Sequence, residues 1–202
     1  MTVANRGGAG TGNSTAPACY PRRPPLPHAV PVPVSESDIV IVRARHGQLP
    51  EVQRLAGVIW RAHYPGIITH EQIEYMLERG YALDTLGGFL DAPGRGLELA
   101  VVDGGLAGFA AWYVTGNPSE AKLDKLYVLQ SRQRNGLGGR LIACVEGHAR
   151  DAGARTLLLN VNKNNISAVR AYEKHGFAIR EAVVVDIGRG FVMDDYVMAK
   201  PI

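Results

Sequence analysis

The most informative segment of this chain reads Leu123-Asp124-Lys125-Leu126-Tyr127-Val128, followed by Gln133-Arg134-Asn135-Gly136-Leu137-Gly138-Gly139-Arg140-Leu141. The first part is typical of a β-strand over 123–129, and the glycines open a helix that runs from about Gly136 to Ala152. A helix N-terminus leaves its first amides free and carries partial positive charge. Glycines let a ligand approach those amides closely, so the segment predicts a pyrophosphate site with Arg132 and Arg134 at its rim.

This glycine loop is not the P-loop pattern, and the dinucleotide pattern requires glycine where Leu141 stands. It does fit Gln/Arg-x-x-Gly-x-Gly/Ala over residues 133–138. About 30 residues later, a strand is followed by Asn-x-x-Ala-x-x-x-Tyr-x-x-x-Gly-Phe, with Asn165, Ala168, Tyr172, Gly176 and Phe177 on its positions. With these two blocks the chain resembles the GNAT superfamily of N-acetyltransferases, which use the first block to hold the pyrophosphate of acetyl-coenzyme A.

The order of elements also fits that superfamily over about residues 38–200. Hydrophobic periodicity predicts strands at 39–43, 97–102, 106–114, 123–129, 156–161, 177–187 and 191–199. It predicts helices after Leu49, after Thr69, at 136–152 and at 166–175, with a short amphipathic piece at 85–90. Thr69 and Gln72 have the spacing of a capping box. The resemblance implies an α/β (α+β) GNAT fold, with a mixed, mostly antiparallel sheet of about seven strands flanked by about four helices.

Composition separates a leader from this domain. Residues 1–37 hold seven of the 12 prolines and contribute +2 of the net charge of +3. We expect 1–37 to be a disordered Pro/Gly-rich leader and 38–202 to be the acetyltransferase domain. The nearly neutral domain argues against a nucleic-acid partner. No apolar run is long enough for a membrane helix, no secretory signal precedes the domain, and two cysteines cannot form a disulfide framework. We therefore expect a cytoplasmic protein without a metal.

The resemblance also implies which residues form the site. Backbone atoms of Leu126, Tyr127 and Val128 would bind the pantetheine amides and polarise the carbonyl. Asn165 would cap the helix after the strand and touch the coenzyme, although capping alone could explain an asparagine there. Tyr172 would lie near the sulfur as the acid, or would only pack its ring. The residues expected to bind acetyl-coenzyme A are Leu126, Tyr127, Val128, Gln133, Arg134, Asn135, Gly136, Leu137, Gly138, Gly139, Asn165 and Tyr172.

Asp124 is the candidate base. Strand alternation predicts that it shares a face with Leu126 and Val128. The stretch around it is similar to Leu-Glu-Asp-aromatic-aromatic-Val of diamine acetyltransferases, where the glutamate is a proposed base. The alternative is a surface carboxylate paired with Lys122 or Lys125.

The acceptor is the least determined part of the function. Acetyl transfer to a primary amine by direct attack in a ternary complex is expected, and a homodimer is compatible with the sequence. The last two strands carry four acidic residues that would draw a polyamine-like small molecule, or that only keep solvated strand edges charged: Glu181, Asp186, Asp194 and Asp195. A protein or peptide amine, and a non-enzymatic coenzyme A-binding module, are the alternatives.

Three histidines and a cysteine call for separate interpretations. His63 and His70 flank a Pro-Gly turn and could line the acceptor site, because the first two helices roof that site in the superfamily. Cys144 and His148 lie four residues apart on the helix, and we expect both to pack with its apolar stripe rather than act as a thiol–imidazole pair.

Overall fold

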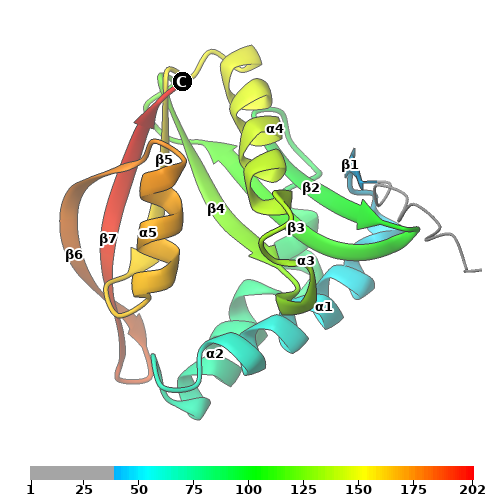
Figure 1. Cartoon of the computed structure of the whole chain (residues 1–202). Helices are drawn as coiled ribbons and strands as arrows, with labels where there is room; N and C mark the ends of the chain where they lie inside the picture. The colour runs from blue at the N-terminus through cyan, green and yellow to red at the C-terminus, as the bar shows by residue number, and fades with distance from the viewer. Residues whose placement is uncertain (1–38) are drawn as a thin grey trace, which may run out of the picture. The chain divides into compact units, whose positions relative to one another are not determined.

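A computed structural model describes residues 39–202, which belong to one compact unit (Figure 1). The expected leader lies outside the described residues. Seven strands form: β1 Ile39–Arg43, β2 Arg95–Val102, β3 Gly105–Val114, β4 Glu120–Val128, β5 Thr156–Asn162, β6 Ala178–Gly188 and β7 Phe191–Pro201. The α-helices are α1 Leu49–His63, α2 His70–Gly80, α3 Leu83–Gly87, α4 Leu137–Asp151 and α5 Ile166–Lys174. The expected fold is confirmed, and the short piece expected at 85–90 is the additional helix α3.

Local chemistry sets the ends of these elements. Thr69 caps α2, since its Oγ1 accepts a hydrogen bond from the Gln72 amide at 3.2 Å. The predicted capping box is incomplete, because the Gln72 side chain instead donates to the carbonyl of Val192 on β7 at 2.9 Å. A tertiary contact has therefore replaced the local one, and it ties α2 to the last strand.

Two tight turns join the antiparallel strand pairs. Asp103 and Gly104 connect β2 to β3 with φ angles of 52° and 79°, as a hairpin turn with two left-handed residues requires. Gly188 at the end of β6, and Arg189 and Gly190 between β6 and β7, all have positive φ as well. Both turns lie where the sequence predicts them.

The strand order is β1-β2-β3-β4-β5-β7-β6, and within the described residues only β4 and β5 are parallel neighbours. Their pairing covers Glu120–Leu123 against Thr156–Leu159 and then stops. Beyond that point β4 keeps β3 as its neighbour and β5 keeps β7. Figure 1 shows β4 diverging from β5 and β7. The C-terminal halves of β4 and β5 therefore carry backbone groups with no strand opposite them.

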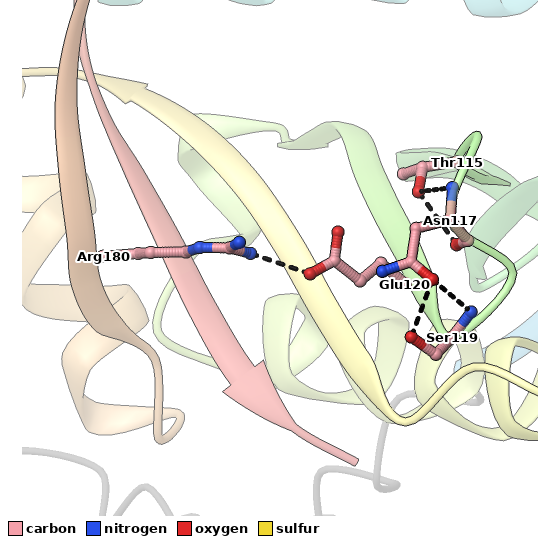
Figure 2. A network of polar contacts seen from close by, with 5 residues as sticks. All are labelled: Thr115, Asn117, Ser119, Glu120 and Arg180. Carbon is pink, nitrogen blue, oxygen red and sulfur yellow. Dashed lines mark hydrogen bonds and ion pairs between the residues drawn. The ribbon is translucent and has the colours of Figure 1, made fainter.

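The paired end of β4 is held by polar contacts (Figure 2). Arg180 on β6 donates to the Glu120 carboxylate at 2.8 Å. In the turn before β4, the side-chain oxygen of Asn117 accepts from the Ser119 amide and hydroxyl at 3.1 and 2.9 Å. These contacts lie at the N-terminal end of β4, where β4 is still paired with β5. They therefore stabilise the paired part of the two strands, not the part where the strands separate.

Each face of the sheet carries its own core. The α4-side core packs α4 and α5 against one face, around Leu137, Leu141, Leu159 and Met198. The α1-side core packs α1, α2 and α3 against the other, around Trp60, Ile73, Leu86 and Phe109. Among residues 39–202, no helix is long and apolar enough to cross a membrane.

Candidate active site

The N-terminus of α4 has the geometry that an anionic ligand requires. Gly136 is the N-cap with a left-handed φ of 76°, and the Arg140 amide donates to its carbonyl at 3.0 Å. The amides just before Arg140 therefore have no partner within the helix. A Cβ added at Gly136 or Gly138 would meet no atom within 4 Å, so both positions are open for a ligand to approach. This end of α4 fits a pyrophosphate.

The rest of the glycine loop divides into exposed and structural residues. Gln133, Arg134 and Asn135 are exposed, and the Gln133 side chain donates to the carbonyl of Val128 at 3.2 Å. Leu137 is buried in the α4-side core, so only its backbone can face a ligand. A Cβ at Gly139 would lie 2.8 Å from the His175 ring, so this glycine permits close packing against the end of α5.

Arg132 and Arg134 are not equivalent at the rim of this loop. Arg132 lies 3.5 Å from Asp103 in the β2–β3 turn, so its charge already has a partner. Arg134 is exposed with a positive φ of 66°. Arg134 is thus the better placed of the two to attract a phosphate.

The separated end of β4 places its side chains on alternating faces. Leu126 and Val128 pack against the α4-side core, and Tyr127 packs against the α1-side core. One edge of this segment pairs with β3, where Tyr127 lies opposite Phe109. The other edge faces the wedge between β4 and β5, so its backbone groups can bind an amide-containing chain there.

Asp124 does not share a face with Leu126 and Val128, and that prediction is wrong. Ala111 pairs with Lys125 and Trp112 with Leu123, so Asp124 is an extra residue in a β-bulge that breaks the alternation. Its carboxylate lies 2.5 Å from the ammonium of Lys125. That ammonium also lies 5.2 Å from the ring centroids of Tyr81 and Phe89 in the α1-side core. Pairing with Lys125 was one of the two alternatives for Asp124.

Asn165 caps α5 as predicted. Its side-chain oxygen accepts from the Ala168 amide at 3.3 Å and from the Ser167 hydroxyl at 3.1 Å. Its side-chain nitrogen lies 3.0 Å from Nε2 of His63, at the end of α1. Asn165 is 5% exposed, and it therefore joins the first helix to the last one.

Tyr172 projects from α5 into the α4-side core, where Leu126, Val128 and Leu137 also pack. Its ring lies edge-on to Phe177, with centroids 5.8 Å apart. Burial and the neighbouring Tyr64 raise the pKa of its hydroxyl, which stays protonated near neutral pH. Packing and a proton-donating role are thus compatible in one residue.

Tyr64 and Asp195 were not predicted as part of one site, and the structure couples them electrostatically. Tyr64 follows α1, and its hydroxyl lies 3.2 Å from that of Tyr127. Burial raises the pKa of Tyr64, and so does the Asp195 carboxylate. A tyrosine directly before the Pro65-Gly66 turn was the available sequence signal, but neither periodicity nor spacing connects it with a residue on β7.

The four acidic residues of β6 and β7 do not form one patch. Asp194 and Asp195 are consecutive strand residues, so their side chains point to opposite faces. Asp194 forms an ion pair with Lys163, and Asp186 accepts a hydrogen bond from the Gly188 amide at 2.7 Å. The sequence-based picture of a shared acidic surface therefore does not describe these residues.

The three histidines lie in different environments. His63 contacts Asn165, whereas His70 is exposed at the start of α2. His148 does not pack in the apolar stripe as predicted, because its side chain is 45% exposed and stacks on the Trp112 ring.

The side chain of Cys144 is half-buried beside His148 and Glu98. Ligand atoms of the three residues lie within 4.8 Å of one another. Glu98 already accepts hydrogen bonds from Arg43 at 2.7 Å and from the Trp112 indole at 3.2 Å. Those contacts account for this buried carboxylate without a metal ion.

Comparison with known proteins agrees with this geometry. The model of the acetyltransferase (GNAT) family matches residues 55–177. An uncharacterised N-acetyltransferase of Mycobacterium tuberculosis H37Rv is 29% identical over 136 residues, or 67% of this chain and 86% of the relative. Streptothricin acetyltransferase of Streptomyces lavendulae is 33% identical over 88 residues, or 44% of this chain and 47% of the relative.

Solved structures share the fold. PaiA N-acetyltransferase of Thermoplasma acidophilum, crystallised with coenzyme A, aligns with a TM-score of 0.68 and 22% identity. The alignment covers 81% of this chain and 99% of that one. The family match extends over more than half of the chain and spans the α4 loop, the separated strands and α5. The chain therefore belongs to the acetyltransferase (GNAT) family and is an acetyltransferase with acetyl-coenzyme A as its co-substrate.

Proposed function

We propose that residues 38–202 transfer the acetyl group of acetyl-coenzyme A to a primary amine of a small molecule, by direct attack in a ternary complex. One observation carries this proposal: the open N-terminus of α4, the separated end of β4 and Tyr172 on α5 converge through the α4-side core. Anion binding, an unpaired backbone edge and a proton donor are what a thioester of coenzyme A needs.

Each part has a role in this proposal. The backbone amides of 136–139 and the Arg134 side chain bind the pyrophosphate, with Gln133 and Asn135 beside them. The free backbone edge of 126–128 binds the pantetheine amides, and Asn165 holds the start of α5 next to them. The co-substrate supplies an activated acetyl group. The Tyr172 hydroxyl donates a proton to the departing sulfur, for which its raised pKa keeps it protonated.

The acceptor is proposed to be a small amine, with polyamines as the first class to test. The relative named streptothricin acetyltransferase, 33% identical over its aligned part, is named for streptothricin and not for a protein substrate. This supports a small acceptor. The similarity of the β4 stretch to diamine acetyltransferases motivates polyamines, although Asp124 lies beside Lys125.

An amine panel tests this function. The purified protein is incubated with acetyl-coenzyme A and with spermidine, n-butylamine, an amino sugar or a peptide with a free N-terminus, and released thiol is measured against a reaction without amine. We expect thiol release with at least one small amine. Preference for the peptide over every small amine would contradict the small acceptor, and failure to bind acetyl-coenzyme A at millimolar concentration would contradict acetyl transfer.

A further inference from the structure

Asp195, on β7, is a buried carboxylate with one oxygen that lacks a hydrogen-bond partner. It is 4% exposed, and its Oδ1 is the only buried side-chain nitrogen or oxygen atom in residues 39–202 without a hydrogen-bond partner. Leaving a buried acceptor unsatisfied costs free energy, and a charged acceptor costs more. A single case among the buried side-chain atoms of residues 39–202 therefore calls for a specific explanation.

The residues around Asp195 do not supply that partner. Asn162 lies directly opposite on β5, and its side-chain oxygen accepts from the Asn164 amide at 3.0 Å, but its side-chain nitrogen makes no hydrogen bond to Oδ1 of Asp195. Lys163 forms its ion pair with Asp194, which points to the opposite face of β7. Burial raises the pKa of Asp195, while a side-chain hydrogen bond with Asn160 and the charge of Lys122 each lower it by a smaller amount, and neither satisfies Oδ1. The neighbourhood favours a missing hydrogen-bond donor at Oδ1.

The position of Asp195 connects it with the acetyl-transfer site. Asn162 opposite it belongs to the part of β5 that has no pairing with β4, so Asp195 lies one strand away from the wedge. Gln72 of α2 contacts Met193, two residues before Asp195, which places Asp195 on the face covered by α1 and α2. The Asp195 carboxylate raises the pKa of the Tyr64 hydroxyl, and Tyr64 in turn raises the pKa of Tyr172.

Other carboxylates on or beside the sheet already have a cationic partner. Glu98 is held by Arg43 at 2.7 Å, Glu146 by Lys200 at 2.5 Å, and Asp124 by Lys125 at 2.5 Å. A cationic ligand at any of these would have to displace a fixed cation. At Asp195 it would satisfy an atom that lacks a partner.

We propose that the Asp195 carboxylate binds the ammonium group of the acceptor and takes its proton, so that the acceptor is a small primary amine that enters as a cation. This inference rests on the proposed acetyl transfer. It assigns the role of base to β7 instead of to Asp124 on β4.

The proton balance follows from this assignment. One ammonium proton moves to Asp195, and the freed nitrogen lone pair forms the C–N bond to the acetyl carbon. The C–S bond breaks with its electron pair on sulfur, which takes the proton of the Tyr172 hydroxyl. The tyrosinate recovers a proton from the newly acylated nitrogen, leaving a neutral amide. The proton on Asp195 is released to solvent after the products leave.

The test compares Asp195→Asn with Asp194→Asn, a matched loss of the adjacent carboxylate on the opposite face. We expect kcat/KM for n-butylamine and spermidine to fall by about 100-fold or more in Asp195→Asn and by less than threefold in Asp194→Asn. Asp195→Glu, which keeps the charge one methylene further out, should recover part of the loss. If Asp195→Asn stays within threefold of Asp194→Asn, the inference fails while acetyl transfer stands.

A second readout does not depend on turnover. With coenzyme A bound and no acetyl donor present, n-butylamine should raise the melting temperature of the wild type, and n-butanol, its uncharged analogue, should not. Asp195→Asn should lose this shift and Asp194→Asn should keep it. An equal shift in both variants, or an equal effect of butanol and butylamine, overturns the inference even if the wild type acetylates neither amine.

The pH dependence of the melting temperature, measured without ligand, distinguishes two roles of Asp195: a buried charge that awaits a ligand, and a carboxyl group that stabilises the fold. The groups that act on Asp195 are Tyr64, Lys122, Asn160, Lys163 and Asp194. Because the folded pKa of Asp195 is raised, its contribution to stability is present at low pH and is lost as pH rises through that pKa. Asp195→Asn should therefore melt roughly 2–4 °C above the wild type at pH 8 and close to it at pH 4. A lower melting temperature at both pH values would indicate a structural role and would overturn the inference.

Discussion

At the scale of single residues, the site depends on which polar groups are already occupied. Asp124, the base suggested by similarity, is paired with Lys125, whereas Asp195 has a buried oxygen without a donor. Asn165 caps α5 and also contacts His63, so one residue serves two elements. Tyr172 combines packing with a hydroxyl whose pKa is raised. The residue type alone therefore did not predict the role of each side chain. The hydrogen-bond or ion-pair partner of a polar group determines whether that group can bind a ligand or transfer a proton.

Removal of one hydroxyl tests Tyr172. Tyr172→Phe should lower kcat by about 100-fold with less than a twofold change in the dissociation constant of acetyl-coenzyme A, since the ring still packs against Phe177. Tyr196→Phe is the matched control, because Tyr196 is also half-buried against the α4-side core. Steady-state kinetics and calorimetric binding of the coenzyme give the two constants. Unchanged turnover in Tyr172→Phe would remove Tyr172 from the role of acid.

At the scale of elements, α4 and the β4–β5 separation provide the binding surfaces. The left-handed Gly136 ends the loop and starts α4, while Gly138 is open without a positive φ. β4 is paired on both sides over its first half and on one side over its second half. A helix end and a strand edge are both places where backbone groups lack partners, which is why ligands bind there.

A valine at position 138 should separate binding from folding. Gly138→Val places a branched side chain over the free amides, so we expect the dissociation constant of coenzyme A to rise at least tenfold with no loss in melting temperature. Gly147→Val lies on the same helix with equally open space and should change neither. Gly136→Val should weaken binding and also cost about 1–2 kcal/mol of stability, because valine disfavours its φ of 76°. Equal coenzyme affinity in the 138 and 147 variants would refute the pyrophosphate site.

At the scale of the whole molecule, two cores hold one sheet between two layers of helices. The α1-side core holds Trp60, Tyr64, Tyr81 and Tyr127, and the α4-side core holds Tyr172. Two contacts join elements that are far apart in the sequence: Asn165 contacts His63, and Gln72 donates to the carbonyl of Val192. The family match at 55–177 lies entirely within the described residues.

A variant comprising residues 38–202 tests the expected domain boundary. The described residues build two cores and include all the proposed site residues, so we expect the same melting temperature to within about 2 °C and the same kcat/KM for the best amine to within twofold. Thermal melting and the thiol-release assay of the two proteins provide the comparison. A large loss of either would show that residues 1–37 contribute to the domain and would refute the proposed boundary.

Features that depend on neighbours in the sequence could be predicted from it. Hydrophobic periodicity located the strands and the long helices, Asp103-Gly104 specified the hairpin turn, and Thr69 and Asn165 specified helix caps. The glycine loop and the Asn165–Phe177 block indicated the family, because anion binding and helix capping use short spacings. These signals are local, since each is set by φ angles or side-chain positions within a few residues.

Features that depend on distant residues required the folded structure. The bulge that turns Asp124 away from Leu126 arises in the pairing of β4 with β3, and the capping box is broken by Val192 on another strand. The separation of β4 and β5 and the unpartnered oxygen of Asp195 depend on which strands and helices lie beside them. Strand register, burial and the pairing of charges are properties of packing between elements. The sequence therefore does not show whether the carboxylate at position 195 is solvated, paired with a cation or buried without a partner.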